Sequence, residues 1–238
     1  MRTNTRSRIA TLVKRHQKLR DNGINLIASE NILSTAAREA LASDLAGRYH
    51  SDFYGGSRFA REIIETTERL AEKLFRAKHA LVSPLSGTLC DLAVMLAFTA
   101  PSEKVAMIPF SSGGFPLGVQ KFHRRLVHLP VNESSYEVDL NQAQKVIVKE
   151  RARLTILGAS YILFPHPVKE LSQFIRSENV PCFLGYDGSH VLGLIACGEF
   201  QDPLREGAEI LFGSTHKSLY GPQGGLILTN SSEHEARL

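Results

Sequence analysis

The 238-residue sequence has few of the residues that mark disulfide-linked, membrane-spanning or metal-binding proteins. Its three cysteines are odd in number and lack Cys-x-x-Cys spacing, so we expect Cys90, Cys182 and Cys197 to be buried thiols in a reducing compartment. No apolar run approaches the roughly 18 residues of a membrane span. The histidines show no paired ligand spacing, which argues against a metal site. The sequence therefore predicts a cytoplasmic protein without bound metal or membrane contact.

Acidic residues are absent from the first twenty positions, which hold seven Lys or Arg. Together with the amphipathic run at residues 9–13, this composition is also typical of an organelle presequence. Elsewhere basic and acidic residues are interleaved, so the net charge of +4 forms no stripe for nucleic acid. With 43% hydrophobic and 22% charged residues, the chain has a globular composition and enough length to bury a core.

Strand and helix patterns alternate along most of the chain. We expect strands at residues 81–84, 105–109, 126–131, 154–159, 182–186, 210–213 and 226–229, and helices at 36–46, 60–75, 89–98, 140–149 and 168–175. Strands that alternate with helices predict an α/β domain with a largely parallel sheet.

One lysine lies in a distinctive setting. The apolar run at 210–213 leads to small hydroxyl residues, then to His216 and Lys217, and then to a turn rich in Gly before the next apolar run. This order predicts a strand, an exposed lysine on a tight turn and a second strand. An amine dehydrated among small residues has a lowered pKa and can condense with a carbonyl, which is the requirement for a Schiff-base lysine. A phosphate-binding loop does not fit, because its glycines precede the lysine. An ordinary polar turn is the alternative.

A second motif, Tyr186-Asp-Gly-Ser-His190, ends the apolar run at 182–186. Open α/β sheets bind ligands beyond the carboxyl ends of their strands, so Asp187 lies where a ligand would bind. In a pyridoxal phosphate enzyme such an Asp keeps the pyridine nitrogen protonated. Alone, the Asp-Gly pair is as typical of a turn. Together with Lys217, it favours the cofactor.

Two polar segments precede predicted helices. Ser86-Gly-Thr88 opens the apolar helix at 89–98, where free N–H groups, hydroxyl donors and the helix dipole favour a phosphate, although Ser and Thr are also the usual caps. Ala28-Ser-Glu-Asn31 precedes the helical pattern at 36–46, and we expect its side chains to cap that helix.

These motifs resemble the serine hydroxymethyltransferase family of fold-type I pyridoxal phosphate enzymes. The agreement keeps the family's order through residues 25–31, 54–56, 86–88, 187–190 and 214–225. The resemblance implies a three-layer α/β large domain like that of aspartate aminotransferase, over residues 31–238, preceded by an arm at 1–30 that contacts a second subunit. Residues 12–31 align with this arm without a break, which favours the arm over a presequence. The family's carboxyl-terminal small domain, with the arginine that holds the substrate carboxylate, is expected to be absent.

The resemblance also assigns roles to single residues. Lys217 would hold pyridoxal phosphate, Asp187 the ring nitrogen, and His190 would support that pairing. The remaining cofactor contacts would be Ser86, Gly87 and Thr88 at the phosphate, Phe115 stacked on the ring, Ser160 near the ring oxygen, and His216 beside the lysine. Substrate contacts would be Ser29 at the carboxylate, with Tyr49 and Tyr54 reaching the neighbouring subunit's site in a homodimer.

The resemblance leaves three functions open. Serine hydroxymethyl transfer to tetrahydrofolate has the motif order in its favour. The position of the family's catalytic glutamate is occupied by Ser51, with Asp52 beside it, which favours a folate-independent threonine aldolase or transaldolase on the same scaffold. The third possibility is a catalytically incomplete protein that binds the cofactor.

Overall fold

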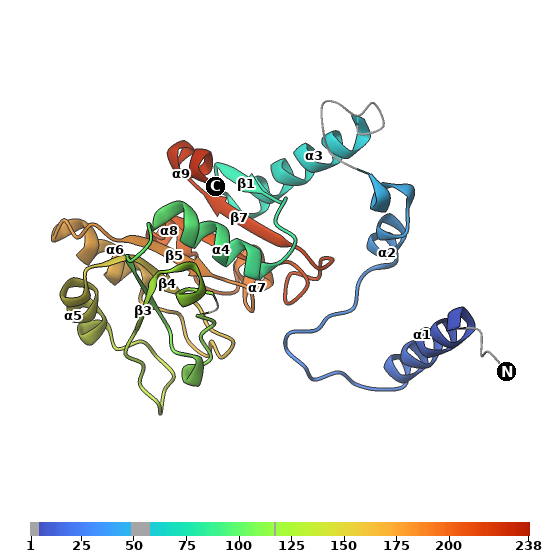
Figure 1. Ribbon diagram of the computed structural model, residues 1–238, viewed down its shortest axis with the longest axis horizontal. Coiled ribbons are helices and arrows are strands. Elements are labelled where there is room, and N and C mark those ends of the chain that lie inside the picture. The colour runs from blue at the N-terminus through green and yellow to red at the C-terminus, as the bar shows by residue number, and fades with distance from the viewer. Residues whose placement is uncertain (1–4, 49–57, 117) are drawn as a thin grey trace.

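The computed structural model describes residues 5–48, 58–116 and 118–238 (Figure 1). Within these residues, seven strands form one sheet in the order β1-β7-β6-β5-β4-β2-β3. The strands are β1 (His79–Leu81), β2 (Lys104–Met107), β3 (Arg125–His128), β4 (Ala152–Leu157), β5 (Phe183–Asp187), β6 (Ile210–Ser214) and β7 (Gly225–Thr229). Neighbours from β6 to β3 are parallel, whereas β7 is antiparallel to both β6 and β1. The sheet is therefore mixed but mostly parallel, as predicted.

Helices cover both faces of this sheet. The helices are α1 (Thr5–Asp21), α2 (Thr35–Leu41), α3 (Arg58–Phe75), α4 (Gly87–Phe98), α5 (Leu140–Glu150), α6 (Val168–Ser177), α7 (Leu192–Cys197), α8 (Pro203–Glu206) and α9 (Ser232–Arg237), with short 3-10 turns at Asp44–Gly47, Phe110–Ser112 and Gln120–Phe122. Helix α4 packs on one face, and α3 and α5 to α8 contribute to the core on the other. This gives the predicted three-layer α/β architecture.

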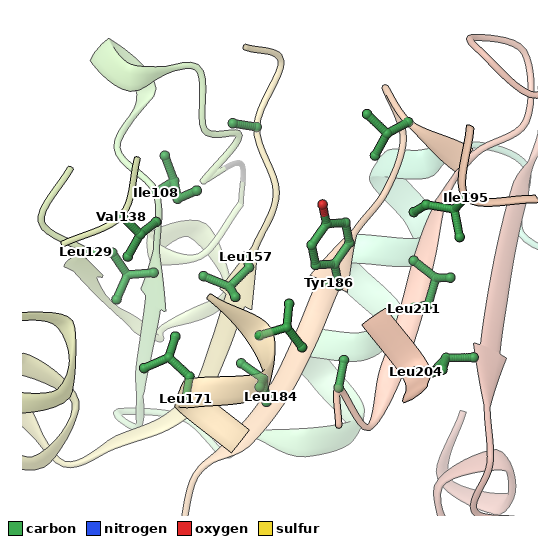
Figure 2. Close-up of a cluster of buried hydrophobic side chains, with 14 of the residues drawn as sticks. Ile108, Leu129, Val138, Leu157, Leu171, Leu184, Tyr186, Ile195, Leu204 and Leu211 are labelled. Atoms are coloured by element: carbon green, nitrogen blue, oxygen red, sulfur yellow. The ribbon is translucent and has the colours of Figure 1, made fainter. Parts of the chain in front are cut away.

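The alternation of side chains along β6 shows how the two cores form. Ile210 and Phe212 face the α4 side, whereas Leu211 faces the opposite core, because successive strand residues point to opposite faces. Figure 2 shows part of that opposite core, in which Leu211 and Tyr186 lie among side chains from several helices and strands. Burial of each large aliphatic side chain contributes about 1.5–3 kcal/mol, so these two clusters fix the sheet that positions the site.

The amino-terminal segment that contains α1 and α2 lies away from the sheet. Helices α1 and α2 extend beside the α/β body in Figure 1. Between them, Ile24 and Leu26 are 91% and 89% exposed. No helix in the described part of the chain is long and apolar enough to cross a membrane.

Three predictions about local structure were wrong. The helix expected at 36–46 is the shorter α2 followed by a 3-10 turn. Its N-cap is Ser34, whose Oγ accepts a hydrogen bond from the Ala37 N–H at 3.2 Å, so residues 28–31 do not cap it. Cys90 and Cys182 are buried, but Cys197 is exposed just before the left-handed Gly198 that ends α7. Burial raises the pKa of Cys90 to about 12 and that of Cys182 to about 11.

Candidate active site

A cavity of about 610 Å³ opens where β4, β5 and β6 reach their carboxyl ends. This is the edge at which parallel α/β sheets bind ligands. The cavity brings together ten of the predicted site residues: Ser29, Ser86, Gly87, Thr88, Phe115, Ser160, Asp187, His190, His216 and Lys217. Tyr49, Tyr54 and the neighbouring Ser51 and Asp52 lie outside the described residues.

The turn between β6 and β7 carries Lys217 into this cavity. The turn is closed by Thr215, whose N–H donates to the Gly224 carbonyl at 3.1 Å and whose Oγ1 donates to the Pro222 carbonyl at 2.6 Å. Asn31 ties the amino-terminal segment to the same turn, because its Nδ2 donates to the Lys217 carbonyl at 2.5 Å. Lys217 is half-buried, so the prediction of an exposed lysine was wrong. This partial burial matches the dehydration that a nucleophilic lysine requires.

A histidine contacts the lysine side chain directly. The Lys217 Nζ lies 3.1 Å from His190 Nε2. Burial, followed by the charges of Lys217 and His216, lowers the pKa of His190 to about 4. The imidazole is therefore neutral at neutral pH, and its Nε2 can accept a hydrogen bond from the lysine ammonium. His190 is thus placed to orient Lys217.

Asp187 forms the end of β5. Its Oδ1 accepts a hydrogen bond from the Ser189 N–H at 2.9 Å. Burial raises the pKa of Asp187, against the opposing effects of the Ser189 hydrogen bonds and the Lys217 charge. A Cβ at Gly158 would lie 2.1 Å from the Asp187 carbonyl oxygen, and Gly158 has a φ of +121°, so only glycine lets the chain after β4 approach Asp187 this closely. A cationic group bound beside this carboxylate would stabilise its ionised form.

The first turn of α4 forms another wall of the cavity. Ser86 is the N-cap, because its Oγ accepts a hydrogen bond from the Leu89 N–H at 3.2 Å, and its hydroxyl hydrogen can still be donated. The N–H groups of Gly87 and Thr88 are in the first turn, where no intrahelical acceptor exists. A Cβ at Gly87 would lie 2.9 Å from Ser214 Cβ, so glycine is needed for α4 to approach β6. This helix start is suited to an anionic group.

Three buried polar atoms around the cavity have no hydrogen-bond partner in the described part of the chain: Asp91 Oδ1, Ser214 Oγ and His216 Nδ1. Leaving such atoms unpaired costs about 1–3 kcal/mol each, so their concentration at one cavity favours a polar ligand there. Asp91 is not among the site residues predicted from the sequence, because the helix at 89–98 has an otherwise apolar pattern. A lone carboxylate in that helix was the signal that could have revealed it.

The fold and the cavity define an α/β chain of the fold-type I class. Its structure matches that of an L-threonine transaldolase from Pseudomonas fluorescens with a TM-score of 0.88 and 27% identity, over 97% of this chain and 55% of that one. More narrowly, the chain belongs to the serine hydroxymethyltransferase family, whose model matches residues 3–236.

Curated relatives agree with this family. The chain is 42% identical to a serine hydroxymethyltransferase of Methanothermobacter marburgensis over 233 residues, which is 93% of this chain and 54% of that protein. It is 39% identical to a serine hydroxymethyltransferase of Thermoplasma acidophilum over 236 residues, which is 94% of this chain and 55% of that protein. The chain thus spans about half the length of these relatives.

Proposed function

We propose that this chain binds pyridoxal phosphate and contributes to a serine hydroxymethyltransferase reaction, in which serine and glycine are interconverted and one carbon passes to tetrahydrofolate. The observation that carries the proposal is the convergence of a half-buried lysine, a half-buried aspartate and a helix start suited to an anion on one cavity. These are the three kinds of group that an aldehyde, a pyridine nitrogen and a phosphate require.

The residues present fit this cofactor. Lys217 would hold it covalently, Asp187 would pair with the ring nitrogen, and the first turn of α4 would bind the phosphate through Ser86, Gly87 and Thr88. Phe115 and Ser160 lie in the cavity wall, where they would contact the ring and its oxygen. Ser214 Oγ and His216 Nδ1, which have no hydrogen-bond partner among the described residues, would gain polar partners. When bound, the cofactor supplies an electron sink for negative charge on the α-carbon of an amino acid.

The chain's own side chains would then orient the reacting groups. His190 is neutral and its Nε2 lies within hydrogen-bond distance of the Lys217 Nζ, so it would hold the Lys217 amine at its present position. Asp187 would supply negative charge at the ring, fixed by the Ser189 N–H. Ser29 lines the cavity on the amino-terminal side and would contact the carboxylate of a small amino-acid substrate.

A folate-independent aldolase or transaldolase is the second candidate. It is favoured by the similarity to a threonine transaldolase and by Ser51 at the glutamate position. Cleavage of threonine at a rate that tetrahydrofolate does not change would select it. A cofactor-binding protein without turnover would bind pyridoxal phosphate and respond to no amino acid.

We also propose that residues 1–30 form an arm and residues 31–238 the cofactor-binding domain of a cytoplasmic homodimer with shared active sites. The exposed apolar side chains of Ile24 and Leu26 support the arm's role as a contact with a second copy. Tyr49 and Tyr54 would reach the partner's cavity.

Borohydride reduction followed by peptide mass spectrometry tests the proposed function. After incubation with pyridoxal phosphate, the reduced cofactor should be found on the peptide that contains Lys217 and should disappear in Lys217→Arg. Lys104→Ala is the matched control, because Lys104 pairs with Glu150 at 2.6 Å, away from the cavity. Labelling spread evenly over surface lysines would contradict the proposal.

A further inference from the structure

The cavity that Asp187 lines has a second carboxyl group in its wall, that of Asp91. Asp91 is the one acidic residue of α4, and it is 5% exposed. It lies on the sheet-facing side of the helix, where the other buried residues are Gly87, Cys90, Val94, Met95 and Phe98. Asp91 is therefore a polar group on a helix face that otherwise forms the apolar core.

Nothing in the described part of the chain satisfies this carboxyl group fully. Its Oδ1 is buried and has no hydrogen-bond partner there. The charged or titratable groups around it are the neighbouring Cys90 on α4 and, around the cavity, Asp187 on β5, His190 after β5, and His216 and Lys217 on the β6–β7 turn. Lys217 is paired with His190, so it is not an exclusive counterion for Asp91.

The protonation states of Asp91 and Asp187 follow from the cost of burying charge and from their mutual repulsion. A buried carboxylate without a counterion costs several kcal/mol, so it takes up a proton instead. Two carboxyl groups that interact do not both ionise easily. As pH rises, the pair loses one proton first and retains the other to a higher pH. Asp187 accepts a hydrogen bond from the Ser189 N–H, whereas Asp91 Oδ1 accepts none in the described residues. Asp187 is therefore the better place for the negative charge.

We propose that Asp91 and Asp187 form a carboxyl pair that holds one proton at neutral pH, with the proton on Asp91, so that Asp91 is a positioning residue for Asp187. The pair would then carry one negative charge, which would match one cationic N–H of a ligand bound in the cavity, and Asp91 would add an O–H donor to the cavity wall. The link to the ring nitrogen rests on the proposed function, but the protonation state of the pair does not.

Burial and the neighbouring Asp187 charge raise the pKa of Asp91 well above its ordinary range, while Lys217 opposes this effect. The folded state thus binds more protons than the unfolded state above the unfolded pKa of about 3.9. The contribution of this group to the free energy of unfolding is fully present below that pH and is lost as pH rises through the folded-state pKa. Asparagine resembles the protonated acid, so the melting temperature of Asp91→Asn should fall less with rising pH than that of the unchanged protein.

Infrared difference spectroscopy on the cofactor-free protein tests the protonation state directly. At neutral pH we expect a carboxylic acid C=O band that shifts in heavy water, disappears in Asp91→Asn and persists in Asp187→Asn. The matched control is Asp44→Asn, since Asp44 is exposed and bonded to Arg48 at 2.7 Å. A band that is absent at neutral pH, or that disappears only with Asp187→Asn, would overturn the proposal.

Cofactor titration provides the second readout. Asp91→Asn should bind pyridoxal phosphate about as well as the unchanged protein and retain its affinity at higher pH, whereas Asp91→Leu, which lacks the donor, should bind about tenfold more weakly or worse. Equal affinity in all three proteins would contradict the positioning role. If the unchanged protein does not bind the cofactor, the proposed function fails, while the infrared result still decides the carboxyl pair.

Discussion

The chemical properties of Lys217 and Asp187 depend on the groups around them as well as on the side chains themselves. Asp187 is the last residue of β5 and Lys217 follows the end of β6, and the parallel arrangement of these strands brings both residues to one cavity. His190 Nε2 contacts the Lys217 amine, and the Ser189 N–H donates a hydrogen bond to the Asp187 carboxylate. At the scale of single residues, the site therefore depends on neighbours that hold each group in position.

Replacement of Asp187 tests its charge. Asp187→Asn keeps the shape of the side chain but cannot supply a carboxylate to a protonated ring nitrogen, so pyridoxal phosphate should bind at least about tenfold more weakly, the effect of roughly one charge-assisted hydrogen bond. Fluorescence titration measures this change. Asp44→Asn should leave binding unchanged, and equal affinity in Asp187→Asn would exclude the ring contact.

Replacement of Gly87 tests the close approach of α4 to β6. In Gly87→Ala the added Cβ would lie 2.9 Å from Ser214 Cβ, and we expect a loss of about 1–3 kcal/mol in the free energy of unfolding. Urea denaturation measures the loss. Gly47→Ala is the matched control, because a Cβ there meets nothing within 4 Å of the described structure. Similar stability of the two variants would show that α4 shifts to make room.

At the scale of elements, α4 joins the core to the site. Its first turn lines the cavity, and its buried face packs against β6 and β7 through residues such as Val94 and Phe98. Any displacement of the helix would move Gly87, Thr88 and Asp91 together. Core packing of α4 should therefore influence cofactor binding as well as stability.

Shortening one side chain on the buried face of α4 and one on its exposed face separates the effect of packing from that of helix propensity. Phe98→Ala removes a buried ring, and we expect it to lower the free energy of unfolding by about 3–5 kcal/mol. Leu96→Ala changes a side chain that is 45% exposed, so its effect in the same urea titration should be much smaller. Comparable losses would contradict the assignment of the buried face.

The alternation of strands and helices was predictable from apolar runs, because period-2 and period-3.6 patterns are local. The antiparallel position of β7 was not, since strand direction depends on how the turn after Lys217 closes. The true cap of α2, Ser34, was also missed, because residues 28–31 offered equivalent polar side chains. For the site, strand ends indicated Asp187 and Lys217, but the role of Asp91 depends on burial that only the packed helix shows.

At the scale of the whole molecule, the amino-terminal segment lies outside the sheet's core, yet Asn31 ties it to the Lys217 turn. The segment exposes several large apolar side chains. Monomeric proteins rarely expose large apolar patches. A second copy of the chain is the partner that the proposed function provides for this surface.

Sedimentation equilibrium tests the proposed dimer. We expect the unchanged protein to be dimeric, and a variant with both Ile24→Asp and Leu26→Asp to be monomeric with an unchanged circular dichroism spectrum, because these side chains are not part of the chain's own core. A monomeric unchanged protein, or a variant that remains fully dimeric, would contradict the contact by the arm.

The presence of a reactive lysine in the cavity can be tested by the visible absorption spectrum of the protein with pyridoxal phosphate. We expect a new band that is absent in Lys217→Ala, present in Lys104→Ala, and altered when glycine, serine or threonine is added. A band that ignores every amino acid would restrict the chain to cofactor binding. The same spectrum from the unchanged protein and Lys217→Ala would show that the cavity has no reactive lysine and that the proposed function is wrong.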